Sequence, residues 1–269
     1  MAIGRIKCRL KGSQTRQLRE EIASSLGITE AQASERVDRS FGVVFWEDVE
    51  SYFRLRVDKE SLGELIEIRG IENLHTALEK GKGALLCTGH VRGIFMLMIA
   101  LHLQGYKLNA IRRSPKGRQG PIARWLNRRT TLVEAGHCTF LWMQQDNLKV
   151  AVQAAKALRR NEIVIVLIDA RFPTEPVQAR LLNRPMPLPS GHVVLAQACG
   201  TPLLNFYIRS SDGLPRIAEI GKPHYAHNDV QASVQHCISE LENEILKSPA
   251  DWMWHQERGL WNRESEIQS

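Results

Sequence analysis

The sequence predicts an α/β fold, in which a largely parallel central sheet is covered by helices on both faces. Short apolar runs alternate with stretches of helical periodicity along most of the chain. The apolar runs are too uniformly hydrophobic for strands with one solvated face, so helices must cover both sides of the sheet. With 269 residues, 43% of them hydrophobic, the chain is long enough to bury one large core.

The first part of the chain is expected to be a helical lead-in to this fold. Apolar residues recur there at helical spacing, as at Leu18 and Ile22, and Thr29 has the character of a capped helix start. We therefore expect residues 1–65 to form an N-terminal helical lead-in and residues 66–269 to form the α/β unit.

Strands and helices then alternate in a regular order, and each is predicted from its pattern. Apolar or β-branched runs predict strands at 66–70, 83–88, 106–111, 131–133, 162–168 and 202–208. Helical periodicity predicts helices at 71–80, 93–104, 121–129, 148–160, 191–198 and 230–246. The proline-rich residues 173–189 are expected to form a loop.

His90 is the first candidate for a catalytic base. It follows the apolar run at 84–88 and a glycine, and catalytic groups of open α/β sheets lie just beyond the carboxyl ends of such strands. A neutral imidazole suits proton abstraction at neutral pH. No acidic residue stands close to His90 along the chain to orient the ring.

The run Leu86-Cys87-Thr88-Gly89-His90, with Gly93 three residues on, resembles the first motif of the lysophospholipid acyltransferase superfamily. It is most similar to the bacterial lipid A lauroyl/myristoyl acyltransferases. In that family an acidic residue follows the histidine after four intervening residues, and this chain has Phe95 there. The N-terminal membrane anchor of those enzymes is also expected to be missing.

Later segments resemble further blocks of the same family, in the same order along the chain. They are residues 165–171 with Asp169, residues 187–191, Gly200-Thr201-Pro202, and the tryptophan-rich segment that begins at Asp251 and Trp252. The resemblance implies acyl transfer from a carrier-protein or coenzyme A thioester. We expect the acceptor to be a small polar molecule with an amine, hydroxylamine or hydroxyl group. We expect the reaction to belong to specialised metabolism.

The phenylalanine at position 95 leaves three explanations open for the missing acid. Asp169, at the end of another strand, supplies the carboxylate in space; or the acceptor is a nucleophile that needs less help; or the chain has lost acyl transfer and only binds an acyl group or carrier protein. A membrane-peripheral lipid A or lysophospholipid acyltransferase is the alternative enzyme.

Four arginines are candidates for contacts with the substrate. Arg112 and Arg113 follow a predicted strand where the related enzymes place a basic group for a phosphate, and a guanidinium suits that task. Arg92 lies inside the first motif, and Arg171 lies beside Asp169. Each of these arginines can instead be exposed to solvent or form a structural ion pair.

The other reactive residues favour structural explanations. Cys87 lies three residues before His90 and could form a Cys-His pair in which the thiol is the nucleophile. Side chains alternate along a strand, so Cys87 is expected to point away from His90 and to pack in the core. His224, His227 and His236 are expected to belong to a surface turn, and we predict no metal site. No glycine-rich phosphate loop or dinucleotide fingerprint occurs, so no cofactor is expected.

Charge and cysteine usage limit the partners and the compartment. The net charge of +7 favours an anionic partner such as an acyl carrier protein, and nucleic acid is a less favoured candidate. The sequence leaves open a peripheral contact with a membrane through Trp125 and Trp252. The five cysteines form no C-x-x-C pair, and no apolar run is long enough for a membrane span. We expect a cytoplasmic protein.

Overall fold

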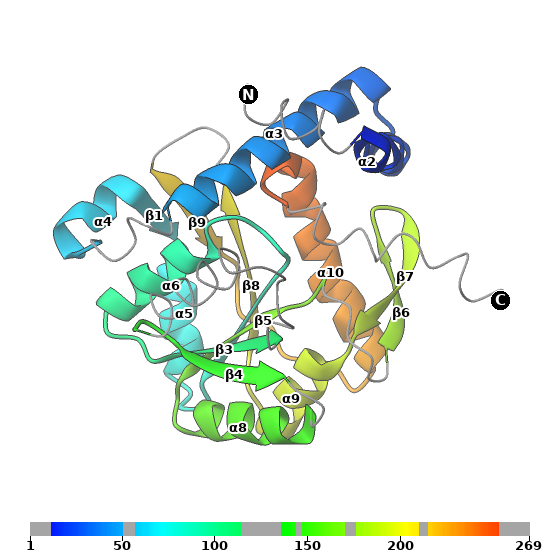
Figure 1. Cartoon of the computed structure of the whole chain (residues 1–269). Coiled ribbons are helices and arrows are strands. Elements are labelled where there is room, and N and C mark those ends of the chain that lie inside the picture. Colours follow the sequence, from blue (N-terminus) through cyan, green and yellow to red (C-terminus); the bar gives the residue numbers. More distant parts are fainter. Residues whose placement is uncertain are drawn as a thin grey trace.

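The core of the protein is a seven-stranded sheet with the order β1-β9-β8-β2-β5-β3-β4 (Figure 1). The computed structural model describes residues 12–50, 57–113, 136–143, 147–169, 176–209 and 215–252. The strands are β1 (Ile66–Arg69), β2 (Ala84–Thr88), β3 (Leu108–Arg113), β4 (Thr139–Met143), β5 (Ile163–Leu167), β8 (Leu203–Arg209) and β9 (Arg216–Ile220). Within this sheet, as far as the structure describes it, β8 and β9 are the antiparallel pair and the other neighbours are parallel. The predicted α/β class with a largely parallel sheet is confirmed.

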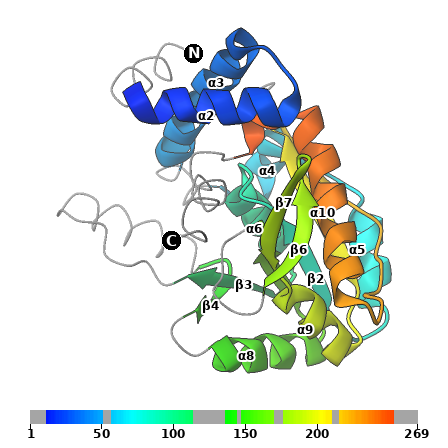
Figure 2. The same cartoon turned by 90° about the vertical axis from the view of Figure 1, so that its right-hand side faces the viewer.

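Helices cover both faces of the sheet (Figures 1 and 2). On one side lie α4 (Lys59–Leu65), α5 (Ile71–Leu78) and α6 (Ile94–Leu103); on the other lie α8 (Asn147–Arg159), α9 (Gly191–Cys199) and α10 (Val230–Lys247). Successive residues of β2 belong to different cores: Leu85 packs with α8 to α10, and Leu86 with α5 and α6. Burial on both faces explains why this strand is a continuous apolar run.

The N-terminal region forms two helices, α2 (Gly12–Leu26) and α3 (Glu30–Glu50). The chain turns between them at Gly27, which has a φ of 61°. The expected cap is present, because Thr29 Oγ1 accepts a hydrogen bond from the Gln32 backbone N–H at 3.3 Å. Leu18 and Ile22 of α2 are buried in the same cluster as the helices α8 to α10.

The prediction of a loop over residues 173–189 is wrong. Most of this segment is an antiparallel hairpin of β6 (Pro176–Leu181) and β7 (Arg184–Pro189). Leu182 and Asn183 turn the chain with φ values of 52° and 62°, as two-residue hairpin turns require. A two-stranded ribbon has an unpaired edge on each strand, and proline is tolerated at such edges. The hairpin packs along α10 in both views (Figures 1 and 2).

Two strands of the main sheet were not predicted. β4 is an edge strand beside β3, and β9 shows alternating burial, which is weaker in sequence than the continuous apolar runs of β2 and β5. The predicted strand at 131–133 and the predicted basic helix at 121–129 lie outside the described residues. Among the helices that the structure describes, none has the length and apolar character needed to cross a bilayer.

Candidate active site

The pairing of β2 with β5 brings His90 and Asp169 together. The two strands lie side by side and parallel, with Thr88 opposite Leu167. His90 and Asp169 each lie two residues beyond the end of their strand, so the shared register delivers both to the same point of the carboxyl edge. The chain between the strands forms α6, β3, β4 and α8, which explains why the two residues are far apart in sequence.

The Asp169 carboxylate receives three hydrogen bonds. His90 Nδ1 lies 2.9 Å from Oδ1, and the His90 backbone N–H donates to Oδ2 at 2.7 Å. The indole N–H of Trp252 also donates to Oδ2, at 2.7 Å. Asp169 is completely buried, whereas the His90 side chain keeps 19% of its surface exposed. The carboxylate is therefore fixed, and the imidazole remains accessible.

The surroundings of Asp169 favour its ionised form. Burial opposes ionisation, but the charge of His90 and the hydrogen bonds from His90 and Trp252 outweigh it, so the pKa of the carboxyl is lowered. An ionised Asp169 requires the proton of the imidazole to sit on Nδ1, which donates to Oδ1. The opposite nitrogen, Nε2, is then the basic atom of the ring.

Gly89 makes this close approach possible. A Cβ at position 89 would lie 2.7 Å from Oδ2 of Asp169 and 3.0 Å from Leu241 Cδ2, both too close for a side chain. The glycine of the Thr-Gly-His run therefore leaves room for the carboxylate to reach the His90 backbone.

The segment after α10 completes the site. Here the 3-10 helix η2 (Pro249–Asp251) leads to Trp252, which is fully buried and forms a bridge with Val91. The Arg92 backbone N–H donates to the Asp251 carbonyl at 3.0 Å, and Ser248 Oγ donates to Asp251 Oδ2 at 2.5 Å. Three segments that resemble family motifs thus meet around one carboxylate.

Trp252 belongs to the site through its contact with Asp169, and this contact was not predicted from the sequence. Its place in the tryptophan-rich segment was the only signal, and that pattern does not say which group the indole contacts. Membrane contact through Trp252, which the sequence left open, is disfavoured because this side chain is fully buried. Trp125, the other residue named for that contact, lies outside the described residues.

Phe95, which stands in place of the motif acid, packs against a cation. The Arg112 guanidinium carbon lies 5.6 Å from the centre of the Phe95 ring, 5.4 Å from Phe140 and 5.9 Å from Trp142. Such contacts hold a guanidinium among ring faces. Arg112, on β3, is thus positioned by aromatic side chains of α6 and β4, and its contact with a substrate remains a prediction.

The other predicted arginines divide into two groups. Arg92 is described and is buried, with 4% of its surface exposed. The side chain of Arg113 and all of Arg171 lie outside the described residues. A further buried arginine, Arg216, lies against Gly93 at the start of α6, where a Cβ on the glycine would be 3.1 Å from Arg216 Cδ. Arg216 is part of no recognised motif, so nothing in the local pattern singles it out.

Cys87 is a core residue in the structure. It is fully buried, and burial raises the pKa of its thiol well above the usual range. A thiolate nucleophile at this position is therefore disfavoured, in agreement with the preferred interpretation of the sequence.

An apolar cavity of about 450 Å³ lies between α8 and α9 at the carboxyl ends of three strands. Its wall includes Leu167, two residues before Asp169, together with Val166 and apolar residues of both helices. Cavities of this size and composition are typical of sites for small apolar ligands.

Only one of the three histidines expected in a surface turn has that position among the described residues: His227 is exposed in the connection between β9 and α10. His224 is half-buried in the same connection, and His236 lies within α10. Ligand atoms of His224, His236 and Glu240 lie within 4.8 Å of one another. The carboxylate of this group is Glu240, one helical turn after His236.

Fold and site together define an α/β protein with a histidine–carboxylate pair at the carboxyl edge of its sheet. The chain belongs to the bacterial lipid A biosynthesis acyltransferase family, whose model matches residues 1–261. This membership supports an enzyme that transfers acyl groups. A comparison with curated proteins finds no match.

Proposed function

We propose that the protein transfers an acyl group from a thioester to a small polar acceptor, with His90 as the general base. Nε2 of His90 takes the proton from the acceptor hydroxyl or amine as its oxygen or nitrogen attacks the thioester carbonyl. The tetrahedral intermediate then collapses, the carbon–sulfur bond breaks, and the leaving thiolate takes up the proton from the imidazolium. The acceptor is acylated and a free thiol is released.

One observation carries this proposal: the buried Asp169 carboxylate accepts from Nδ1 of His90. An ionised carboxylate at this distance selects the tautomer with a basic Nε2 and stabilises the imidazolium that forms during the reaction. This contact supports the first of the three explanations for Phe95, namely that the acid is supplied from another strand. With the acid supplied in this way, the proposed reaction does not require a more reactive acceptor.

Two further features support the donor side of the proposal. The apolar cavity beside α8 and α9 offers room for an acyl chain near the end of β5. The net charge of +7 favours a donor that carries negative charge, such as an acyl carrier protein or the phosphates of coenzyme A. We propose Arg92 and Arg112, with Arg113 and Arg171, as the residues that contact the anionic part of donor or acceptor.

The family name favours a second candidate for the acceptor. Lipid A biosynthesis uses a glycolipid, and an enzyme of that kind works at a membrane surface. The chemistry at His90 would be the same, because a sugar-linked hydroxyl must also lose its proton as it attacks. The two candidates differ in the acceptor and in the need for a lipid surface.

The test compares His90→Ala with the wild-type protein and with His75→Ala, which removes an exposed histidine on α5. Radiolabelled acyl carrier protein and acyl-coenzyme A are offered with a panel of amines and alcohols, and with lipid A precursors in mixed micelles. We expect His90→Ala to lower turnover by about 10²- to 10⁴-fold, the usual contribution of a general base, and His75→Ala to leave it unchanged.

Each outcome decides between stated possibilities. Turnover with soluble acceptors supports the small polar acceptor, and turnover only with the micellar glycolipid supports the membrane-peripheral alternative. Equal turnover in wild type and His90→Ala would contradict the role of His90. Binding of the acyl thioester without transfer to any acceptor would favour a protein that only binds acyl groups.

A further inference from the structure

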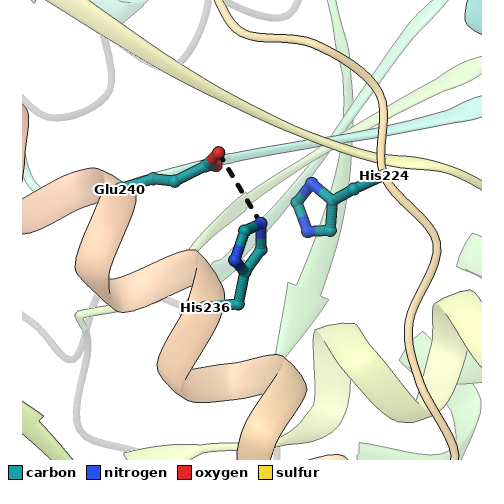
Figure 3. Close-up of side chains that lie close together, drawn as sticks. All are labelled: His224, His236 and Glu240. Carbon is teal, nitrogen blue, oxygen red and sulfur yellow. Dashed lines mark ion pairs between the residues drawn. The ribbon is translucent and has the colours of Figure 1, made fainter.

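A second group of histidine and carboxylate side chains lies away from the residues around Asp169, and it is independent of the proposed acyl transfer. His224 belongs to the connection between β9 and α10, and His236 and Glu240 belong to α10. Figure 3 shows the two imidazole rings and the carboxylate turned toward a common point. We infer that His224, His236 and Glu240 bind one divalent transition-metal ion, with Zn²⁺ the best match.

The spacing of the three side chains is close to that of a metal site. Their ligand atoms lie within 4.8 Å of one another, and tetrahedral zinc with bonds near 2.0–2.1 Å places its ligands about 3.3 Å apart. His236 Nε2 and Glu240 Oε1 are already 3.6 Å apart, one helical turn from each other on α10. The exposed side chain of His236 has the freedom to close the remaining gap.

The backbone holds His224 in place for this role. Its N–H donates to the Leu203 carbonyl at 2.9 Å, and its own carbonyl accepts from the Leu203 N–H at 2.8 Å. On the ring, Nε2 lies 3.4 Å from the Cys237 sulfur. These contacts anchor the imidazole to β8 and to α10, so an ion at the cluster would join the β9–α10 connection to the helix.

Two potential ligand atoms of the cluster are buried and lack a good hydrogen bond. These atoms, His224 Nδ1 and Glu240 Oε2, make no well-formed hydrogen bond within the part of the chain that the structure describes, although the Lys222 backbone lies near the His224 ring and Asn205 lies near Glu240. A bound cation would give both buried atoms a strong electrostatic partner.

The donor set selects the class of ion. Two imidazoles and one carboxylate suit Zn²⁺ and other borderline transition metals, whereas Mg²⁺ and Ca²⁺ prefer oxygen ligands alone. Three protein ligands leave a fourth position for water. Leu203 begins β8, whose neighbour β2 runs parallel and ends near His90, so the cluster lies toward the opposite edge of the sheet from the active site. An ion there would act on stability rather than on acyl transfer.

The full-length protein, stripped with a chelator and dialysed, is titrated with Zn²⁺ by calorimetry and with Co²⁺ by visible absorption. We expect one equivalent to bind, a rise in the thermal midpoint, and the strong absorption of four-coordinate Co²⁺. His224→Ala and Glu240→Gln should each weaken Zn²⁺ binding by at least 10- to 100-fold. His75→Ala, which removes a histidine elsewhere on the surface, is the control and should bind like the wild type.

Glu240→Gln keeps the size of the side chain, so it tests the carboxylate in a folded protein even if His224→Ala does not fold. Failure of the wild type to bind Zn²⁺ or Co²⁺ would overturn the inference. Binding that is equally strong in Glu240→Gln would also overturn it, because the ion would then lie elsewhere. Neither result would bear on His90, since acyl transfer is measured separately.

Discussion

The protein places histidine next to carboxylate in two regions, and the two pairs differ in how well the carboxylate is satisfied. Asp169 is fully buried and accepts three hydrogen bonds, from His90 twice and from Trp252. Glu240 stands 3.6 Å from His236, its side chain is 39% exposed, and its Oε2 makes no well-formed hydrogen bond among the described residues. A saturated carboxylate orients its histidine, whereas an unsaturated one retains capacity for another ligand.

The strongest test of this contrast replaces each carboxylate by its amide. Asp169→Asn is expected to lower turnover by up to about ten-thousandfold, because an amide no longer selects the tautomer with a basic Nε2. Glu240→Gln should leave turnover near the wild-type value. The measurement is the initial rate of acyl transfer at saturating thioester, with circular dichroism to verify folding. Comparable losses in both variants would abolish the distinction between the regions.

A smaller effect is expected from the third donor to Asp169. Trp252→Phe keeps most of the buried ring but removes the N–H that donates to Oδ2. The lost hydrogen bond to a charged group should lower the free energy of unfolding by about 1.5–3 kcal/mol. Urea denaturation measures this change. Trp142→Phe, on the edge strand β4, is the control and is expected to cost less; an equal cost in the two variants would contradict the importance of the indole bond.

Acid should weaken the Asp169 region in a defined direction. The pKa of Asp169 is lowered in the folded state, so its contribution to stability is present above the unfolded pKa, near 3.9, and is lost as the pH falls through the folded value. The urea midpoint of the wild type should therefore fall more steeply below about pH 4 than that of Asp169→Asn. Parallel curves for the two proteins would show that the ionised carboxylate does not stabilise the fold.

The sequence predicted the strands with continuous apolar runs and missed β4, β9 and the hairpin of β6 and β7. β2 and β5 are continuous apolar runs, and their polar ends drew attention to His90 and Asp169. The sequence offered the pairing of these two residues as one of three explanations and could not choose among them, because strand order is a tertiary property that local pattern does not contain. The edge strand β4, the partly exposed β9 and the proline-containing hairpin have weaker patterns.

Individual site residues show the same limit. Trp252 is 83 residues from Asp169 along the chain, and nothing in a tryptophan-rich segment specifies its hydrogen-bond acceptor. The spacing of His236 and Glu240 places them one helical turn apart, which the sequence alone shows. His224 comes close to them through its backbone pairing with Leu203, which the sequence does not show. Spacing within a helix can be read from a sequence, and proximity between separate segments cannot.

The position of Trp252 also sets the order in which the surroundings of Asp169 are completed during synthesis. His90 and Asp169 leave the ribosome well before α10, but the carboxylate lacks its indole donor until residue 252 has emerged. A nascent chain that stops before this point carries both side chains and an incomplete support for them. Translation must therefore pass through nearly the whole α/β unit before His90 and Asp169 are held as in the finished protein.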